Sequence, residues 1–306
     1  MAANSFLEMS RALRLYVPQL PIPLAEQFIR DRYRRILESK DWSALRREGE
    51  FQLNALKSTG TVAITRGATT VTGTGTSFAS TDVGRQFKAG GDAPVYTVSA
   101  YTSSTSITLD RAYGGATVTA STFKIFDGYV TAPTDFLRFL TIVDVGNSYR
   151  LAHWVSQAEL NAYDPQRTNF GDPYLFVDRM YNTASTPMPQ FEVWPYTNAA
   201  RTLYYTYIKR GTDLINDTDI PIWPLRSDVI VSGALADAAR WPGTADKPNP
   251  YFARADYWKS YELEFVDKMI EMERRDEEVY ATYLQQNTVP LHPMSANWLQ
   301  SHAPSW

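Results

Sequence analysis

The N-terminal part of the chain carries helical patterns. Apolar residues three or four positions apart predict a short helix over residues 5–17 and, after a proline-rich break, a longer helix that begins near Pro23 and ends near Asp41. Four arginines occupy the side of the second helix opposite its apolar face: Arg30, Arg32, Arg34 and Arg35. This basic face either lies in solvent or meets an acidic partner in another subunit, and Arg30 and Arg34 are its candidate interface residues.

Two more helices are predicted toward the C-terminus. Residues 226–241 are apolar and small, and Pro242-Gly243 ends that helix. The next helix begins near Pro250 and extends to about residue 286. Apolar residues recur along it every seven positions: Tyr251, Trp258, Phe265, Met272 and Val279. Because the companion row is half polar, this seam packs either within the subunit or on a neighbouring copy. Its candidate interface residues are Trp258, Phe265 and Met272.

Period-two alternation replaces helical spacing in the middle of the chain. Residues 58–127 are rich in Thr, Ser, Gly and Val, and short alternating runs lie between glycines. This pattern predicts a small sandwich or barrel inserted as a module. Residues 128–225 form a second β-rich region, with a short helix over residues 156–162 and Ser156 as its expected N-cap. Two strands are predicted at 190–195 and 201–209.

These patterns divide the chain into five segments. They are an N-terminal helical part (1–57), the inserted β module (58–127), the β-rich part of the main domain (128–225), the C-terminal helices (226–286) and an extended tail (287–306). The predicted fold class is α+β: N- and C-terminal helices form an α-helical body, and the central region is β-rich with an inserted all-β module. The tail lacks helical period but carries apolar anchors, so it packs either on its own subunit or on a partner. Its candidate contacts are Leu291, Trp298 and Trp306.

The amino-acid composition mainly excludes classes of protein and of binding site. The 306 residues are 44% hydrophobic and 21% charged, as in an ordinary globular protein. The net charge of −3 argues against general coating of nucleic acid, which needs a basic surface. The absence of cysteine excludes disulfides and cysteine-ligated metals. No apolar run approaches the roughly 18 residues of a membrane span, and the N-terminus lacks a secretion-signal pattern.

Candidate chemistry is sparse. The three histidines are far apart in the sequence, and none lies in a metal-binding or catalytic motif. No GxSxG motif occurs, so a nucleophile-elbow hydrolase is not indicated. An acidic loop contains Asp213, Asp217 and Asp219, but it lacks the glycine and closing glutamate of a calcium-binding EF-hand, which favours a solvent loop. We therefore expect no enzymatic activity, catalytic residue, cofactor or metal site.

Four stretches of the chain resemble parts of a known class of virion protein. They are LPIPLAEQFIRDRYRRILESKDWS, the module that begins GTVAITRGATTVTGTGTSF, the segment TAPTDFLRF, and the block GALADAARWPGTADKPNPYF. Together they resemble a head-to-tail adaptor, or connector, of a short-tailed bacteriophage. The module itself is similar to small β modules of many phage structural proteins, although a minimal adaptor does not need it.

The resemblance implies a structural virion protein. Its expected assembly is a ring of identical subunits, commonly twelve, that joins the portal protein to the tail nozzle or another tail protein. Genomic DNA would pass through the lumen without sequence-specific binding. The expected location is the head–tail junction of the virion, after synthesis in the host bacterial cytoplasm. The alternatives are a carbohydrate- or receptor-binding virion module, which the β module and the abundant Tyr and Trp allow, and a cell-wall hydrolase.

Overall fold

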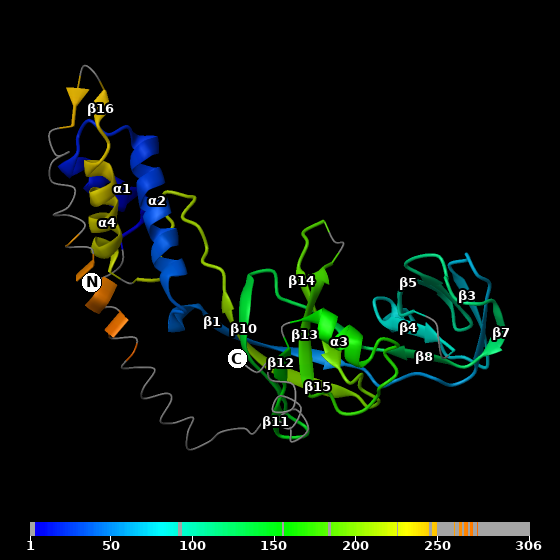
Figure 1. Cartoon of the computed structure of the whole chain (residues 1–306). Coiled ribbons are helices and arrows are strands. Elements are labelled where there is room, and N and C mark those ends of the chain that lie inside the picture. Colours follow the sequence, from blue (N-terminus) through cyan, green and yellow to red (C-terminus); the bar gives the residue numbers. More distant parts are fainter. Residues whose placement is uncertain are drawn as a thin grey trace. The chain divides into compact units, whose positions relative to one another are not determined.

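The computed structural model of the chain describes residues 4–90, 94–154, 156–182, 185–224, 226–244, 247–249, 260, 263–264, 266–268, 270–271 and 274. The chain divides into two compact units. Among the described residues, the first unit contains those up to 47 and those from 208 onward, and the second contains those within 48–207 (Figure 1).

Three helices of the first unit pack against one another: α1 (Phe6–Tyr16), α2 (Ile22–Ser39) and α4 (Ser227–Ala239). At the start of α1, the Ser5 hydroxyl accepts a hydrogen bond from the Glu8 N–H, and the Glu8 carboxylate accepts one from the Ser5 N–H. This capping box fixes where the helix begins. The unit also contains the 3₁₀ turn η1 (Ser43–Leu45) and a small hairpin of β16 (Gly243–Thr244) and β17 (Lys247–Pro248).

The core of the first unit lies between these helices. Helix α4 is buried on nearly all sides because its residues are small or apolar around the whole helix. It meets one buried face of each of the other two helices. The largest fully buried side chains in this core are Trp42, Tyr33, Phe6, Met9, Leu13, Leu20 and Ile29.

Two four-stranded sheets in the second unit share one core. The strands of the first sheet are, in order, β1 (Arg46–Leu53), β15 (Arg201–Lys209), β10 (Phe136–Asp144) and β11 (Tyr149–Arg150). The strands of the second sheet are, in order, β12 (Ala152–Trp154), β13 (Leu175–Tyr181), β14 (Pro189–Trp194) and β9 (Tyr129–Thr131). Helix α3 (Gln157–Tyr163) connects β12 to the loop before β13. Both sheets contribute to an aromatic core that includes Phe51, Phe136, Phe176, Phe191, Tyr205 and Tyr207, the arrangement of a β-sandwich.

A seven-stranded antiparallel sheet completes the second unit and has a core of its own. Its order is β7-β2-β3-β6-β5-β4-β8. The strands are β7 (Val118–Ser121), β2 (Thr61–Ile64), β3 (Thr70–Thr74), β6 (Ser106–Leu109), β5 (Tyr96–Ser103), β4 (Gln86–Ala89) and β8 (Phe123–Phe126). The 3₁₀ turn η2 spans Ser80–Asp82. The curled sheet encloses apolar side chains, among them Val71, Phe87, Ile107, Phe123 and Ile125. We call this sheet the seven-stranded module.

The predicted fold class is wrong. The structure is mostly β-sheet, with 35% strand and 26% helix, and terminal helices do not form its body. One physical reason is β1, which lies inside the segment predicted as helical. Phe51 and Leu53 point into the core while Glu50 and Gln52 are exposed, so β1 alternates as a strand and pairs with β15 about 150 residues later. The five predicted segment boundaries stay predictions.

Several local predictions agree with the structure. Helix α3 begins after Ser156, whose hydroxyl accepts the Ala158 N–H as an N-cap. Strands β14 and β15 match the two predicted strands. Each of these elements follows from periodicity and capping within a short stretch of sequence.

Candidate functional site

The two arginines predicted to face a partner bind within their own unit. Arg30 donates from Nε to the Leu214 carbonyl at 2.9 Å, and its guanidinium lies 5.4 Å from the centre of the Phe6 ring. Arg34 forms a two-point ion pair with Asp213, at 2.6 and 2.7 Å. This hydrogen bonding raises the pKa of Arg34 and lowers the pKa of Asp213. The basic face of α2 therefore holds the loop after β15 in place.

The acidic loop has a structural explanation. Asp213 pairs with Arg34, while Asp219 accepts the backbone N–H groups of Ile215 and Asn216 at 2.7 and 2.8 Å. These hydrogen bonds lower the pKa of Asp219. Across the part of the chain that the structure describes, no group of three His, Cys, Asp or Glu residues is arranged to hold a metal ion.

The other predicted interface residues lie outside the described residues. They are Trp258, Phe265, Met272, Leu291, Trp298 and Trp306. Their roles at the helix seam and in the tail stay predictions. The helices that the structure does describe include none that is long and apolar enough to cross a membrane.

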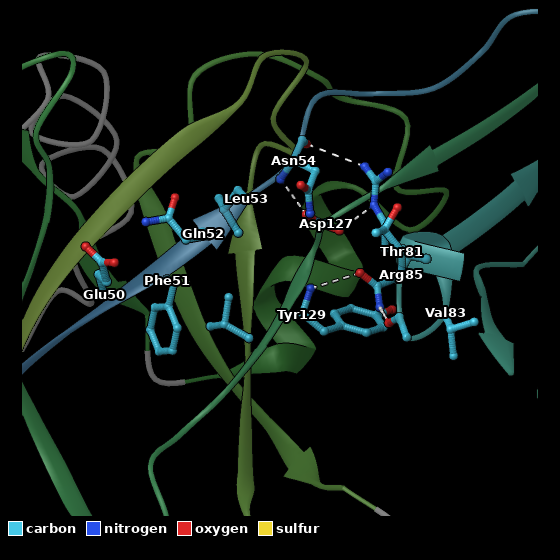
Figure 2. Close-up of a pocket in the computed structure, with 13 residues that line it drawn as sticks. Glu50, Phe51, Gln52, Leu53, Asn54, Thr81, Val83, Arg85, Asp127 and Tyr129 are labelled. Carbon is cyan, nitrogen blue, oxygen red and sulfur yellow. Dashed lines mark hydrogen bonds and ion pairs between the residues drawn. The ribbon is translucent and has the colours of Figure 1, made fainter. Parts of the chain in front are cut away.

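A buried ionic cluster joins the seven-stranded module to the sandwich within the second unit. Arg85, only 6% exposed, donates from Nε to Asp127 at 2.7 Å and from one terminal nitrogen to Asp82 at 3.0 Å. Its other terminal nitrogen donates to the Ala55 carbonyl at 2.8 Å. Asp127 also accepts the backbone and side-chain N–H groups of Asn54 (Figure 2). We call Asp82, Arg85, Asp127 and Asn54 the junction cluster.

The junction cluster brings together residues that are distant in sequence. Arg85 lies just before β4, Asp127 follows β8, and Asn54 follows β1. Lys57 extends the cluster with an ion pair to Asp82 at 2.8 Å. The Gln86 side-chain oxygen accepts the N–H of Gly128 at 2.7 Å and that of Tyr129 at 3.1 Å. These contacts tie both chain connections of the module to its base, and a cavity of about 320 Å³ lies beside them.

A second buried network lies in the sandwich around Arg167. Its Nε donates to Glu192 at 2.6 Å, and a terminal nitrogen donates to Asn161 at 2.5 Å. The backbone of Arg167 has a φ of 54°, which is unfavourable for a residue with a Cβ atom. Glu192 also accepts the Tyr196 hydroxyl at 2.6 Å. Burial, and then the charge of Glu192, raise the pKa of Tyr196 well above its ordinary value.

Asp164 anchors the same network and should make stability depend on pH. Burial by itself raises its pKa, but hydrogen bonds from Trp194, Thr168 and Asn169, with the charge of Arg167, outweigh burial and lower the pKa. A carboxyl whose pKa is lower in the folded state stabilises the fold above its unfolded pKa of about 3.9. That contribution is lost as pH falls through the folded pKa.

We expect Asp164→Asn to flatten the acid side of the stability profile. Measured by urea unfolding of the second unit between about pH 7 and pH 3, wild type should lose more stability than the variant. Glu159→Gln, at an exposed position on α3, is the matched control and should follow wild type. Parallel profiles for wild type and Asp164→Asn would show that Asp164 does not make stability depend on pH.

The sequence patterns missed exposed apolar side chains at the turn between α1 and α2. Leu15 is 82% exposed, Tyr16 51% and Ile22 49%. Phe6, Met9, Leu13 and Tyr16 share one side of the predicted helix, and of these only the first three are buried, together with Ser10. The sequence pattern alone could not tell these exposed residues from buried ones, because an apolar residue at a helix end fits either a core or a contact surface.

Among the residues that the structure describes, no arrangement of side chains points to a particular reaction. His153 lies 3.0 Å from Asp178 and stacks on the Phe176 ring, and both members of that pair are largely exposed. Comparison of the chain with models of known protein families and with characterised proteins finds no match. The proposals below therefore depend on the residues and contacts of this chain.

Proposed function

We propose that this protein is a structural component of a bacteriophage virion, a head-to-tail adaptor that assembles as a ring between the portal and the tail. The proposal starts from the resemblance of four stretches of sequence to such adaptors. In it, the ring contains about twelve copies and DNA passes through the lumen without sequence-specific contacts. The partners are the portal protein and the tail nozzle or another tail protein.

The observation that carries the proposal is the exposed apolar group formed by Leu15, Tyr16 and Ile22. Large apolar side chains gathered at one turn mark contact surfaces more often than isolated exposed ones do. A ring of identical subunits needs a heterologous interface in which one surface meets a different surface of the neighbour. The turn between α1 and α2 is our candidate for one side of that interface.

Assembly of the purified full-length chain tests this proposal. We expect sedimentation velocity to show a species much larger than the 34.6 kDa monomer, and electron microscopy to show closed rings. Leu15→Glu should shift the protein toward monomer while its circular dichroism stays unchanged, because a charge at that exposed position disturbs an interface and not a core. Val145→Glu is the matched control, since Val145 is also a large exposed apolar residue.

The contrary outcomes are specific. A wild-type chain that stays monomeric, alone and when mixed with the portal protein of the same phage, would contradict the adaptor function. Rings that form equally well with Leu15→Glu would place the subunit contact elsewhere and remove the exposed group as support.

A further inference from the structure

An aromatic cavity lies in the sandwich, beside the end of helix α3. Its volume is about 410 Å³, within the range of about 300–1,000 Å³ that is typical of small-ligand pockets. Its aromatic walls come from separate segments of the chain: Tyr163 ends α3, Tyr174 precedes β13 and Trp194 ends β14. The other lining residues are Asn169, Phe170, Gly171, Asp172 and Pro195. The fold of the sandwich therefore gathers aromatic rings and a few polar groups at one hollow.

Two tyrosine rings stand nearly perpendicular to the Trp194 ring. The Tyr163 ring lies 5.3 Å from it at an angle of 81°, and the Tyr174 ring lies 5.4 Å from it at 78°. Trp194 is 2% exposed and its indole N–H donates to the Asp164 carboxylate at 3.0 Å, so this ring is fixed in place. Tyr163 is 49% exposed, which leaves much of its ring open to a ligand. The cavity thus combines a fixed, buried ring with an open aromatic wall.

Backbone hydrogen bonds fix the loop that carries the polar groups. The Asn169 carbonyl accepts the Tyr196 N–H at 3.1 Å, and the Gly171 N–H donates to the Tyr196 carbonyl at 2.9 Å. The Asn169 N–H also donates to the Asp164 carboxylate at 3.3 Å. A ligand that binds to such a loop costs little conformational entropy, because the loop is already ordered.

The polar side chains of this loop keep hydrogen-bonding capacity for a ligand. Asn169 is exposed, and its side-chain amide, which can both donate and accept, forms no hydrogen bond within the part of the chain that the structure describes. One oxygen of the Asp172 carboxylate accepts from Arg201, and the other accepts no hydrogen bond from a described residue. Asp172 is also the only charged group among the described residues that line the cavity. The lining therefore favours a neutral, polar ligand over an acidic one.

We propose that this cavity binds a neutral sugar unit of a glycan. A pyranose ring has an apolar face of C–H groups and an edge of hydroxyl groups that donate and accept hydrogen bonds. The apolar face matches the open ring of Tyr163, and the hydroxyl groups match the Asn169 amide and the Asp172 carboxylate. A mostly aromatic lining with a few fixed polar groups is typical of small-ligand sites. This binding activity goes beyond the proposed structural role and does not depend on it.

Saturation-transfer NMR on the full-length protein tests the site. The probes are cellobiose, maltose, lactose and glucose, with sorbitol and glucuronate as controls. We expect at least one of the sugars to bind and to receive saturation mainly at its ring C–H protons, because these protons contact the aromatic wall. Sorbitol has the hydroxyl groups without the ring and should give no signal. Glucuronate should bind more weakly than glucose, because its carboxylate meets the like charge of Asp172.

Substitutions locate the binding in this cavity. Tyr163→Ala removes the open aromatic wall, and we expect it to weaken binding at least about tenfold, whereas Tyr163→Phe keeps the ring and should retain most of the affinity. Asn169→Ala removes an exposed amide, so it should weaken binding while the melting temperature stays that of wild type. Tyr204→Ala is the matched control, because Tyr204 is 48% exposed on β15 and does not line the cavity.

The outcomes that contradict the proposal are specific. Absence of binding by all four sugars overturns it, and so does binding that Tyr163→Ala and Asn169→Ala both leave unchanged. Sorbitol that binds as tightly as the sugars overturns the stacking role of Tyr163, since hydroxyl groups alone would then be recognised. Hexaproline that binds while the sugars do not would assign the cavity to a proline-rich peptide, the other kind of ligand that aromatic grooves accept.

Discussion

Replacing Arg85 with methionine is expected to destabilise the second unit by about 3–5 kcal/mol, since its removal takes the shared cation away from two buried carboxylates. Asp82 is fully buried and Asp127 nearly so, and Arg85 is the cation that contacts both. Methionine fills a similar volume but cannot donate a hydrogen bond. The Ala55 carbonyl also loses a donor.

The effect should be strongest at the base of the seven-stranded module. Urea unfolding, followed by hydrogen exchange in β4 and β8, measures the loss of stability locally. Arg66→Met provides the matched control, because Arg66 is exposed in the turn between β2 and β3 and its loss should change stability by no more than about 0.5 kcal/mol. Equal stabilities for the two variants would show that the junction cluster does not hold the module.

A double substitution separates the charge effect from loss of packing. Asp82→Asn combined with Arg85→Met removes one of the two carboxylates that lose their contact with Arg85. We expect the double variant to recover part of the stability lost in Arg85→Met, because a neutral amide is less costly to bury than a carboxylate that has lost one of its two cations. No recovery would indicate that the contacts of the arginine stem dominate.

Trp42→Ala is expected to destabilise the first unit by about 3–5 kcal/mol, the usual cost of removing a buried aromatic side chain. Trp42 is fully buried in the core between α1, α2 and α4. Its indole N–H donates to the Ile36 carbonyl at 2.7 Å, close to the end of α2. Its ring lies 5.8 Å from that of Trp223. The substitution removes the hydrogen bond and leaves a cavity.

Trp42→Phe is the control for the cavity. It keeps an aromatic ring and loses the indole donor, so the expected cost is smaller than that of alanine. The measurement is hydrogen exchange of the amides in α2 and α4 in each variant. Wild-type exchange in Trp42→Ala would show that this side chain does not support the core.

If the adaptor proposal is correct, the two buried ion networks have a mechanical consequence. The junction cluster and the Arg167 network fix the module and the 164–170 loop of the second unit through many directed hydrogen bonds. Buried polar groups that are all hydrogen-bonded restrict the structure to one arrangement more strictly than apolar contacts do.

The sequence by itself determined the local elements of this protein. Spacing of apolar residues located α1, α2 and α4, the hydroxyl of Ser156 located the start of α3, and period-two alternation located β14 and β15. These signals are local because helix caps and side-chain periods depend on neighbours within a few residues. The fold class and the sites depended on more than that.

Only the tertiary structure decided which distant residues meet. It paired β1 with β15, within a segment that the sequence predicts as helical, and it brought Arg85 to Asp127 and Arg34 to Asp213. It also placed Lys88 opposite Lys124 on neighbouring strands. The physical reason is that one strand edge can pair with many other strands, and one charged side chain with many opposite charges. Which pair forms depends on packing across the whole chain.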